Sequence, residues 1–247
     1  MKTLRKALHE LKIPYDDKKI EKLLIFFNEI VKSSKKFNLT GLKTWDEIRD
    51  ALFIRSLRYS FIINSKLSEY NLLKNKNLHI LDIGTGAGIP SIPMKIFYPN
   101  INLSLVESSQ KKCEFIKSTI EILNFEQIKI YNTRAEILGQ SESRESFDLV
   151  LTRALAKLPT LAELAIPLTK IGGFVITAKG ELPNKELKES EYITKILGVT
   201  ENFSEKVNIP KFLPDDNFII WRKTNKSPEI YPRRDGIPKK NPIVKNS

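Results

Sequence analysis

One stretch of the chain decides the fold: Leu81-Asp82-Ile83-Gly84-Thr85-Gly86-Ala87-Gly88-Ile89-Pro90. Its apolar start predicts the end of a buried strand, and its glycines predict a tight loop that leads into a helix. Glycine in such a loop lets the backbone approach a ligand closely. A dinucleotide-binding loop has the spacing G-x-G-x-x-G, with the pyrophosphate at the helix N-terminus. Here the third glycine comes one residue early, so the loop of Gly84, Gly86 and Gly88 predicts a nucleotide or nucleoside site of a different kind.

Carboxylates at two strand ends indicate the type of ligand. Glu107 ends the next predicted strand, where its carboxylate can accept hydrogen bonds from both ribose hydroxyls of a nucleoside. Asp82 lies just before the glycine loop and can reach the loop amides or a ligand ammonium group. A ligand with an adenosine end and an amino-acid end would meet one carboxylate at each end, with no phosphate to bind. These features favour S-adenosylmethionine over NAD.

The sequence that follows Leu78 predicts a doubly wound α/β domain with a mainly parallel sheet. Short apolar runs alternate with amphipathic helical patterns, which is typical of repeated βα units. Gly172-Gly173 predicts a turn into the fifth strand. The expected strands are 78–83, 102–107, 127–131, 147–152, 174–178 and 218–222, and the expected helices are 89–98, 110–123, 158–169 and 184–196.

The regions on either side of this domain have different patterns. Apolar residues recur at helical spacing in residues 1–75, which predicts an N-terminal helical cap, with the α/β domain at 76–222. Residues 223–247 carry seven basic and two acidic side chains with four prolines and no periodicity, which predicts an extended basic tail. Such a tail is either an RNA clamp or a loosely ordered end.

Composition narrows the class of protein and of partner. The chain has 247 residues, of which 41% are hydrophobic, enough for a sizeable core. It has no apolar run long enough for a membrane span, and its start does not resemble a secretory signal. The single cysteine, Cys113, fits a reducing cytoplasm, where we expect the protein to act. A net charge of +12 favours a polyanionic partner, although a Lys-rich genome composition could supply part of the excess.

Several motifs together resemble one family of enzymes. The chain resembles the bacterial methyltransferases that modify guanine N7 in small-subunit (16S) ribosomal RNA, once called glucose-inhibited division protein B. The matching segments are LDIGTGAGIPSIPMKI (81–96), LVESSQKKCEFIK (105–117), TRAE (133–136), FDLVLTRALAKLPTLAELAIPL (147–168), ITAKGE (176–181), the N-terminal Asn38-Leu39-Thr40 and the ending YPRRDGIPKKNPI (231–243). The resemblance implies a Rossmann-like class I methyltransferase sheet with S-adenosylmethionine as cofactor.

The resemblance also implies roles for individual residues. In the donor site, Gly84 and Ile89 would border the methyl donor, Glu107 would hold its ribose, and Ala135-Glu136 would flank its adenine. Arg153 would lie near donor and substrate as a candidate catalytic residue together with Lys179, and Arg134 and Lys179 would add positive charge to the RNA cleft.

Each of these basic residues also has a purely structural interpretation. Arg153 could form a salt bridge with a neighbouring acid, Lys179 could be a solvated strand end, and Arg134 could pair with Glu136 or Glu163.

Three positions depart from the family's pattern. Members often carry a His-x-x-Asp-Ser-Leu motif in the cap, where this chain has Leu52-Phe53-Ile54-Arg55-Ser56-Leu57. Many have a basic residue just before the last strand, where this chain has Asp215-Asp216-Asn217. Ser91 replaces a usual glycine. The first two departures concern contacts that the family would make with its substrate.

The chemistry expected at guanine N7 agrees with the residue types. N7 is an unprotonated lone pair, so its attack on a sulfonium methyl needs positioning more than a general base. His9 and His79 are therefore expected to be structural, and Cys113 to be an ordinary helix residue. Because methylation places a positive charge on the base, Arg153 and Lys179 are expected to hold phosphates rather than the ring.

Two rival functions and several details stay open at this stage. A nicotinamide-dependent oxidoreductase would share the fold but would need a G-x-G-x-x-G loop, and an RNA-binding module without catalysis would need no intact donor loop. Within the methyltransferases, an enzyme that acts on another RNA site is the alternative to guanine N7. The expected partner is ribosomal RNA or a small-subunit assembly intermediate, with no membrane. No His or Cys spacing predicts a metal site. The sequence leaves the oligomeric state open, with a monomer expected.

Overall fold

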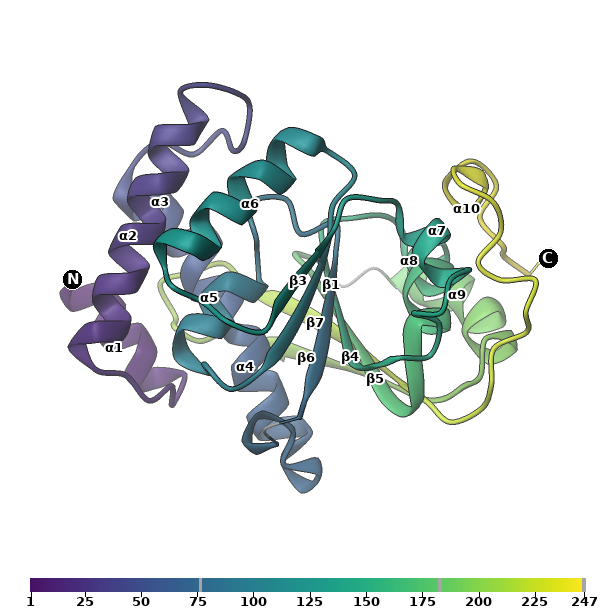
Figure 1. Cartoon of the computed structure of the whole chain (residues 1–247). Coiled ribbons are helices and arrows are strands. Elements are labelled where there is room, and N and C mark those ends of the chain that lie inside the picture. The colour runs from purple at the N-terminus through teal and green to yellow at the C-terminus, as the bar shows by residue number, and fades with distance from the viewer. Residues whose placement is uncertain (76, 182–183, 246–247) are drawn as a thin grey trace.

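A computed structural model describes residues 1–75, 77–181 and 184–245 of the chain. Its centre is a seven-stranded sheet with the strand order β3-β2-β1-β4-β5-β7-β6 (Figure 1). Strands β1 to β5 pair in parallel, whereas β7 is antiparallel to both β5 and β6. The strands are β1 (His79–Ile83), β2 (Asn102–Val106), β3 (Ile128–Tyr131), β4 (Phe147–Arg153), β5 (Thr169–Lys179), β6 (Val199–Val207) and β7 (Asp216–Lys223). The predicted α/β fold with a mainly parallel sheet is confirmed.

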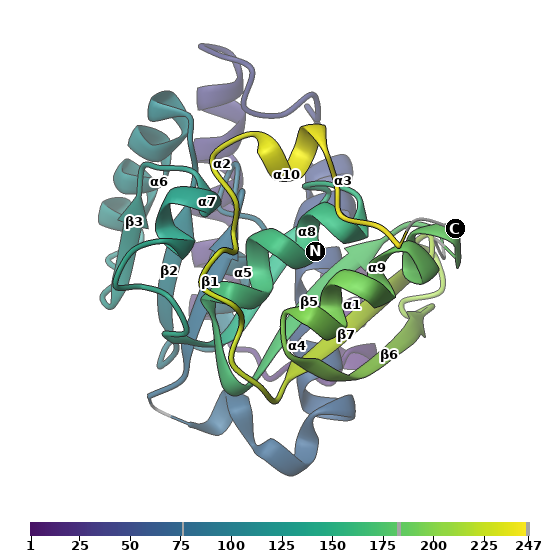
Figure 2. The same cartoon turned by 90° about the vertical axis from the view of Figure 1, so that its right-hand side faces the viewer.

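Helices cover both faces of this sheet, as the two perpendicular views show (Figures 1 and 2). The N-terminal helices pack with α5 and α6 on one face, and α7, α8 and α9 pack on the other. The N-terminal helices are α1 (Lys2–Glu10), α2 (Asp17–Ser34), α3 (Trp45–Ile48), a π-helical segment (Arg49–Ile54) and α4 (Arg55–Lys66). The others are α5 (Ser91–Phe97), α6 (Gln110–Ile122), α7 (Ala135–Gly139), α8 (Leu158–Ala165), α9 (Asn184–Ile196) and α10 (Ile237–Lys240).

Local signals in the sequence explain where two N-terminal helices begin. The Asp16 carboxylate accepts a hydrogen bond from the backbone N–H of Lys19 at 2.8 Å and so caps α2. Thr44 and Glu47 form a reciprocal capping box at the start of α3. Each cap satisfies backbone donors that have no partner within the helix, so each fixes the residue at which the helix begins.

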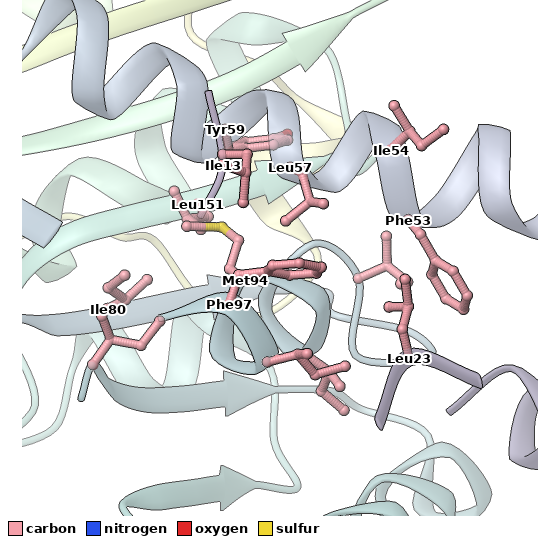
Figure 3. Close-up of a cluster of buried hydrophobic side chains, with 14 of the residues drawn as sticks. Ile13, Leu23, Phe53, Ile54, Leu57, Tyr59, Ile80, Met94, Phe97 and Leu151 are labelled. Carbon is pink, nitrogen blue, oxygen red and sulfur yellow. The ribbon is translucent and has the colours of Figure 1, made fainter. Parts of the chain in front are cut away.

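The N-terminal helices share one hydrophobic core with the sheet. Figure 3 shows side chains of α2, of the π-helical segment and of α4 turned toward those of α5 and of strands β1 and β4. Leu23, Phe53, Leu57, Met94 and Leu151 are all fully buried in this cluster. Because these helices bury their apolar side chains against α5 and the sheet, they are held in place relative to the carboxyl ends of the strands.

Two details differ from the sequence-based expectations. Gly172-Gly173 does not form a turn: both residues lie inside β5, where the register with β4 shifts and Gly172 has a φ of +86°. This is the position at which a bulge lengthens the strand. Strand β6 was not predicted, because most of its side chains are exposed or half-buried and its sequence has no apolar run.

The C-terminal region is more ordered than the expected extended tail. Lys223 belongs to β7 and is fully buried, with its ammonium group 2.7 Å from a Glu145 carboxylate oxygen. Beyond it the chain crosses the side of the sheet that carries α7 and α8, and it forms the short helix α10 (Figure 2). Residues 246–247 of the expected tail lie outside the described residues.

Candidate functional site

A cavity of about 290 Å³ lies where the strand order reverses, at the carboxyl ends of β1, β2 and β4. This edge of an open α/β sheet is the usual place for a ligand, because the connections that leave neighbouring strands there turn to opposite faces. The cavity is lined by Ile83, Gly84, Val106, Glu107, Ser108, Lys112, Thr133, Arg134, Ala135, Glu136, Leu155, Ala156, Thr160, Leu164, Gly236 and Lys239.

The glycine loop forms one wall of this cavity. Gly84, Gly86 and Gly88 have φ values of +68°, +60° and +80°, a backbone region that residues other than glycine rarely adopt. A methyl group on Gly84 would also lie 2.6 Å from Cδ1 of Leu155, which lines the cavity from the segment after β4. The loop therefore requires glycine for two reasons, its backbone conformation and its close packing against the β4–α8 connection.

Glu107 faces this loop from the end of β2 and is 8% exposed. Its Oε2 accepts a hydrogen bond from the Gly86 N–H at 3.0 Å, and its Oε1 accepts one from the Ser109 N–H at 2.9 Å. The backbone carbonyl of Glu107 is held by the side chains of Asn132, at 3.1 Å, and Cys113, at 3.3 Å. The carboxylate is thus fixed in direction at the cavity wall, with both oxygens available to further donors. Cys113 is a buried helix residue behind it.

Asp82 lies beneath the loop and does not line the cavity. It is fully buried, and its Oδ2 accepts hydrogen bonds from the hydroxyls of Thr85, at 2.7 Å, and Ser91, at 2.8 Å. Burial raises the pKa of Asp82 to about 7, partly offset by these two hydroxyls. Its Oδ1 has no hydrogen-bond partner among the described residues. Ser91, the residue that replaces a usual glycine, therefore ties the start of α5 to the buried carboxylate.

The opposite wall is built from the start of α7 and from the C-terminal region. Ala135 and Glu136 form the first turn of α7, and both are almost fully buried. One carboxylate oxygen of Glu136, Oε1, accepts a hydrogen bond from the backbone N–H of Gly236 at 3.1 Å. Residues separated by about a hundred positions in the chain are thereby joined at the cavity wall.

The basic residues expected near the substrate are engaged in contacts within the protein. Arg153 does not line the cavity: its Nη2 donates to the backbone carbonyl of Ala51 at 2.5 Å, which links β4 to the π-helical segment. Burial lowers the pKa of Arg153, and its Nη1 has no hydrogen-bond partner among the described residues. Lys179 is not a solvated strand end, because its ammonium group lies 3.0 Å from Glu186 and donates to the Ala156 carbonyl at 2.9 Å.

Arg134 has a partner that the sequence did not indicate. Its Nε lies 3.2 Å from the carboxylate of Asp235, and both side chains are about half exposed. The pairing with Glu136 or Glu163 that was considered from the sequence is therefore not the one that forms. Glu163 instead binds Arg233, and Glu136 binds a backbone amide.

Two departures from the family pattern meet in one ion-pair network. The Asp216 carboxylate accepts hydrogen bonds from the guanidinium of Arg55, with Nε at 3.0 Å, and from Nη1 of Arg58, at 2.6 Å. Arg58 is fully buried and Asp216 nearly so. The two arginines lower the pKa of Asp216 against the opposing effect of burial. The acidic residue at 216 and the basic residue at 55 thus compensate each other and hold α4 against the start of β7.

The structure brings together only part of the predicted site. Gly84, Glu107, Arg134, Ala135 and Glu136 line one cavity, as a donor site requires. The other predicted residues, Asp82, Gly86, Gly88, Ile89, Arg153 and Lys179, are not among the residues that line it.

The apolar segment after β4 (Leu155 and Ala156) and the C-terminal pair Gly236 and Lys239 were missed. A possible signal for the latter pair was the unusual PRRDG sequence in the tail.

Three further observations concern a metal site, a membrane span and the histidine of β1. In the described ranges, no three His, Cys, Asp or Glu side chains come together as a candidate metal site. No helix of the parts that the structure describes is long and apolar enough to cross a membrane. His79 hydrogen-bonds Ser104 through Nε2 at 2.9 Å at the far end of β1, away from the cavity.

Comparison with known proteins gives consistent matches along the chain. The sequence profile of the family described as rRNA small subunit methyltransferase G matches residues 19–212. The chain is 33% identical over 239 residues to the ribosomal RNA small subunit methyltransferase G of Bacillus cereus (strain AH187), and the match covers 96% of each chain. The protein of the same name from Bacillus thuringiensis (strain Al Hakam) is 33% identical with the same coverage.

A solved structure supports the fold alone. The N-terminal domain of human METTL16 in complex with SAH is similar with a TM-score of 0.55 and 12% sequence identity, over 81% of this chain and 82% of that one.

Proposed function

The chain belongs to the rRNA small subunit methyltransferase G family, and on this premise we propose that it transfers the methyl group of S-adenosylmethionine to N7 of a guanine in small-subunit ribosomal RNA. The main support for S-adenosylmethionine as the methyl donor is the cavity beside the glycine loop, with a fixed, nearly buried carboxylate at Glu107. The acceptor half depends on the family resemblance.

The residues of the cavity fit S-adenosylmethionine. Glu107 presents two carboxylate oxygens at the end of β2, where the two ribose hydroxyls can donate to it. Ala135 and Glu136 form the wall that suits an adenine ring, because the Glu136 carboxylate can accept from its exocyclic amine. The bare Cα of Gly84 lets Leu155 pack closely against the loop, and both residues line the cavity. When bound, S-adenosylmethionine supplies an electrophilic methyl group on a sulfonium centre.

Positioning is the main task of the protein in this reaction. The N7 lone pair of guanine carries no proton, so no side chain has to remove one before methyl transfer. The carboxylates of Glu107 and Glu136 that line the cavity are both engaged by backbone amides, so their expected role is to bind the donor rather than to remove a proton. The protein then accelerates transfer by holding the base and the methyl group in line.

We further propose that Arg153 and Lys179 act near the RNA through phosphate contacts. Arg153 is partly exposed at the carboxyl end of β4, and its Nη2 donates to the Ala51 carbonyl. Because Nη1 is buried and has no partner in the described parts of the chain, the guanidinium would have to turn toward the RNA to donate to a phosphate. Lys179 holds the β4–α8 connection through the Ala156 carbonyl, so its role is expected to be positioning as much as charge. The partner is ribosomal RNA or a small-subunit assembly intermediate, met in the cytoplasm by a monomer that needs no metal ion.

A methyl-transfer assay tests the proposal. Purified protein is incubated with S-adenosylmethionine that carries a tritiated methyl group and with small ribosomal subunits or their RNA from cells that lack this protein, and the RNA is digested to nucleosides. We expect the label in 7-methylguanosine. Label in a different nucleoside would overturn the acceptor assignment. An absence of label from protein that binds the donor would overturn catalysis.

Calorimetry distinguishes the proposed methyltransferase from the alternative of a nicotinamide-dependent oxidoreductase. We expect heat of binding with S-adenosylmethionine and none with NAD, because the glycine loop lacks the dinucleotide spacing. The opposite result would reassign the cavity to a nicotinamide cofactor.

A further inference from the structure

The C-terminal segment Pro228–Asn241, called here the C-terminal strap, crosses α7 and α8 and ends beside the donor cavity (Figure 2). Its sequence has no periodicity, yet its backbone and side chains bind residues from α7 and α8 at several points. The strap therefore has a defined position on the domain, and that position lies at the cavity.

The firmest of these points is an ion pair inside the protein. Glu163 of α8 is fully buried, and its carboxylate accepts hydrogen bonds from the Arg233 backbone N–H at 2.8 Å, from Nε at 2.9 Å and from Nη2 at 2.7 Å. Glu163 raises the pKa of Arg233 accordingly. A buried carboxylate without this partner would be costly, so the strap is anchored firmly at this residue.

The next contacts attach the strap to residues that line the cavity itself. Arg134 pairs with Asp235 at 3.2 Å, Glu136 accepts from the Gly236 N–H at 3.1 Å, and the Thr160 hydroxyl donates to the Pro238 carbonyl at 3.0 Å. Arg134, Glu136 and Thr160 all line the cavity. Each of these wall residues thus faces the cavity and holds the strap, so a change in strap position must change the wall.

Two strap residues also line the cavity directly, Gly236 and Lys239. Gly236 has a φ of +77° and turns the chain into α10, and no atom lies within 4 Å of where its Cβ would be. We propose that the strap is a wall of the donor site, in which Gly236 and Lys239 contact the adenosine end of S-adenosylmethionine. This inference rests on the proposed function, since it assigns the strap to the donor and not to the RNA.

The contact at Glu136 shows how the strap takes part in recognition. The Gly236 N–H of the strap donates to Oε1 of the Glu136 carboxylate, while no described residue donates a hydrogen bond to Oε2. The strap therefore fixes the direction of Glu136 and leaves one oxygen for the exocyclic amine of adenine. The positive charge of Arg233 is paired with Glu163 and that of Arg134 with Asp235, so neither arginine is free to clamp RNA.

Two neighbouring lysines of α10 supply matched variants. Lys239 and Lys240 are both exposed, but only Lys239 lines the cavity. Lys239→Ala and Lys240→Ala remove the same charge from the same short helix. We expect Lys239→Ala to weaken binding of S-adenosylhomocysteine, measured by calorimetry, about five-fold through loss of a side-chain contact, and Lys240→Ala to leave it within about two-fold.

Hydrogen exchange on the wild-type protein provides a second readout that does not depend on any variant's fold. Saturating S-adenosylhomocysteine is expected to slow amide exchange in residues 229–241 by about ten-fold, because a ligand that contacts the strap opposes its local unfolding. Unchanged exchange in the strap under saturation, or equal affinities of the two lysine variants, would overturn the proposal. Equal losses of RNA affinity in both variants, with unchanged affinity for S-adenosylhomocysteine, would also overturn the proposal and would indicate that the strap binds RNA instead. Failure of the wild-type protein to bind S-adenosylhomocysteine at all would refute the proposed function instead.

Discussion

The buried carboxylate of Asp82 makes the stability of this protein depend on pH in a predictable direction. Asp82 is fully buried beneath the glycine loop, and burial raises its pKa from an ordinary value of 3.8 to about 7. The folded state therefore holds its proton more tightly than the unfolded state does. Its stabilising contribution is complete below pH 3.8 and is lost as the pH rises through about 7.

The size of this effect follows from the two pKa values. A rise from 3.8 to about 7 corresponds to about 4 kcal/mol of stability lost between acid and alkaline conditions. About 2–3 kcal/mol of that loss falls between about pH 5 and pH 8, a range in which urea denaturation can be measured. Asp82→Asn keeps the size of the side chain and its acceptor oxygen for Thr85 and Ser91, but it cannot ionise.

The assay compares urea denaturation of the wild-type protein and of Asp82→Asn across this pH range. We expect the free energy of unfolding of the wild type, relative to the variant, to fall by about 2–3 kcal/mol from about pH 5 to pH 8. Asp17→Asn, at an exposed side chain of α2, changes the net charge equally and serves as the control. Parallel curves for wild type and Asp82→Asn would refute the reasoning, because Asp82 would then titrate alike in both states.

Four further substitutions test other parts of the account. Glu107→Gln should weaken binding of S-adenosylhomocysteine about thirty-fold in calorimetry, because the ribose hydroxyls lose a charged acceptor worth about 2 kcal/mol; a change below about three-fold would contradict this. Asp216→Ala leaves the fully buried Arg58 unpaired and should lower the free energy of unfolding by about 3–5 kcal/mol, whereas a loss under about 1 kcal/mol would show that the network is not structural. Arg153→Ala should reduce the slope of log affinity for RNA against log salt by about one, with unchanged binding of S-adenosylhomocysteine; an unaltered slope would remove the phosphate contact. Gly139→Ala would place a methyl group 2.7 Å from the strap's proline ring and should weaken S-adenosylhomocysteine binding about five-fold, whereas wild-type affinity would separate the strap from the donor.

The sheet and the glycine loop could be predicted because the sequence patterns that specify them are local. The ten residues 81–90 contain both the apolar end of a buried strand and the spaced glycines, and Glu107 follows at the end of the next apolar run. Strand β6 carries no such signal: its side chains are mostly polar and exposed, and it forms only because β7 offers an edge with which to pair. Strand β6 therefore depends on its tertiary context, and the periodicity of its sequence does not predict it.

The partners of the charged residues could not be predicted, for a different physical reason. Arg134 had nearby acids in the sequence, but it pairs with Asp235, about a hundred positions away. Glu163 and Arg233 are likewise distant in the chain and meet only because the C-terminal strap crosses α8. Such choices depend on which helix faces the returning chain, so sequence spacing gives no information on them. The strap was accordingly expected to be an extended tail.

A crystal structure of the protein with S-adenosylhomocysteine would show whether the cavity beside the glycine loop binds the methyl donor. We expect both ribose hydroxyls within about 3.2 Å of the Glu107 carboxylate oxygens, with the adenine ring between Ala135-Glu136 and Gly236. Electron density for the ligand outside this cavity, or a Glu107 carboxylate turned away from the ribose, would contradict it.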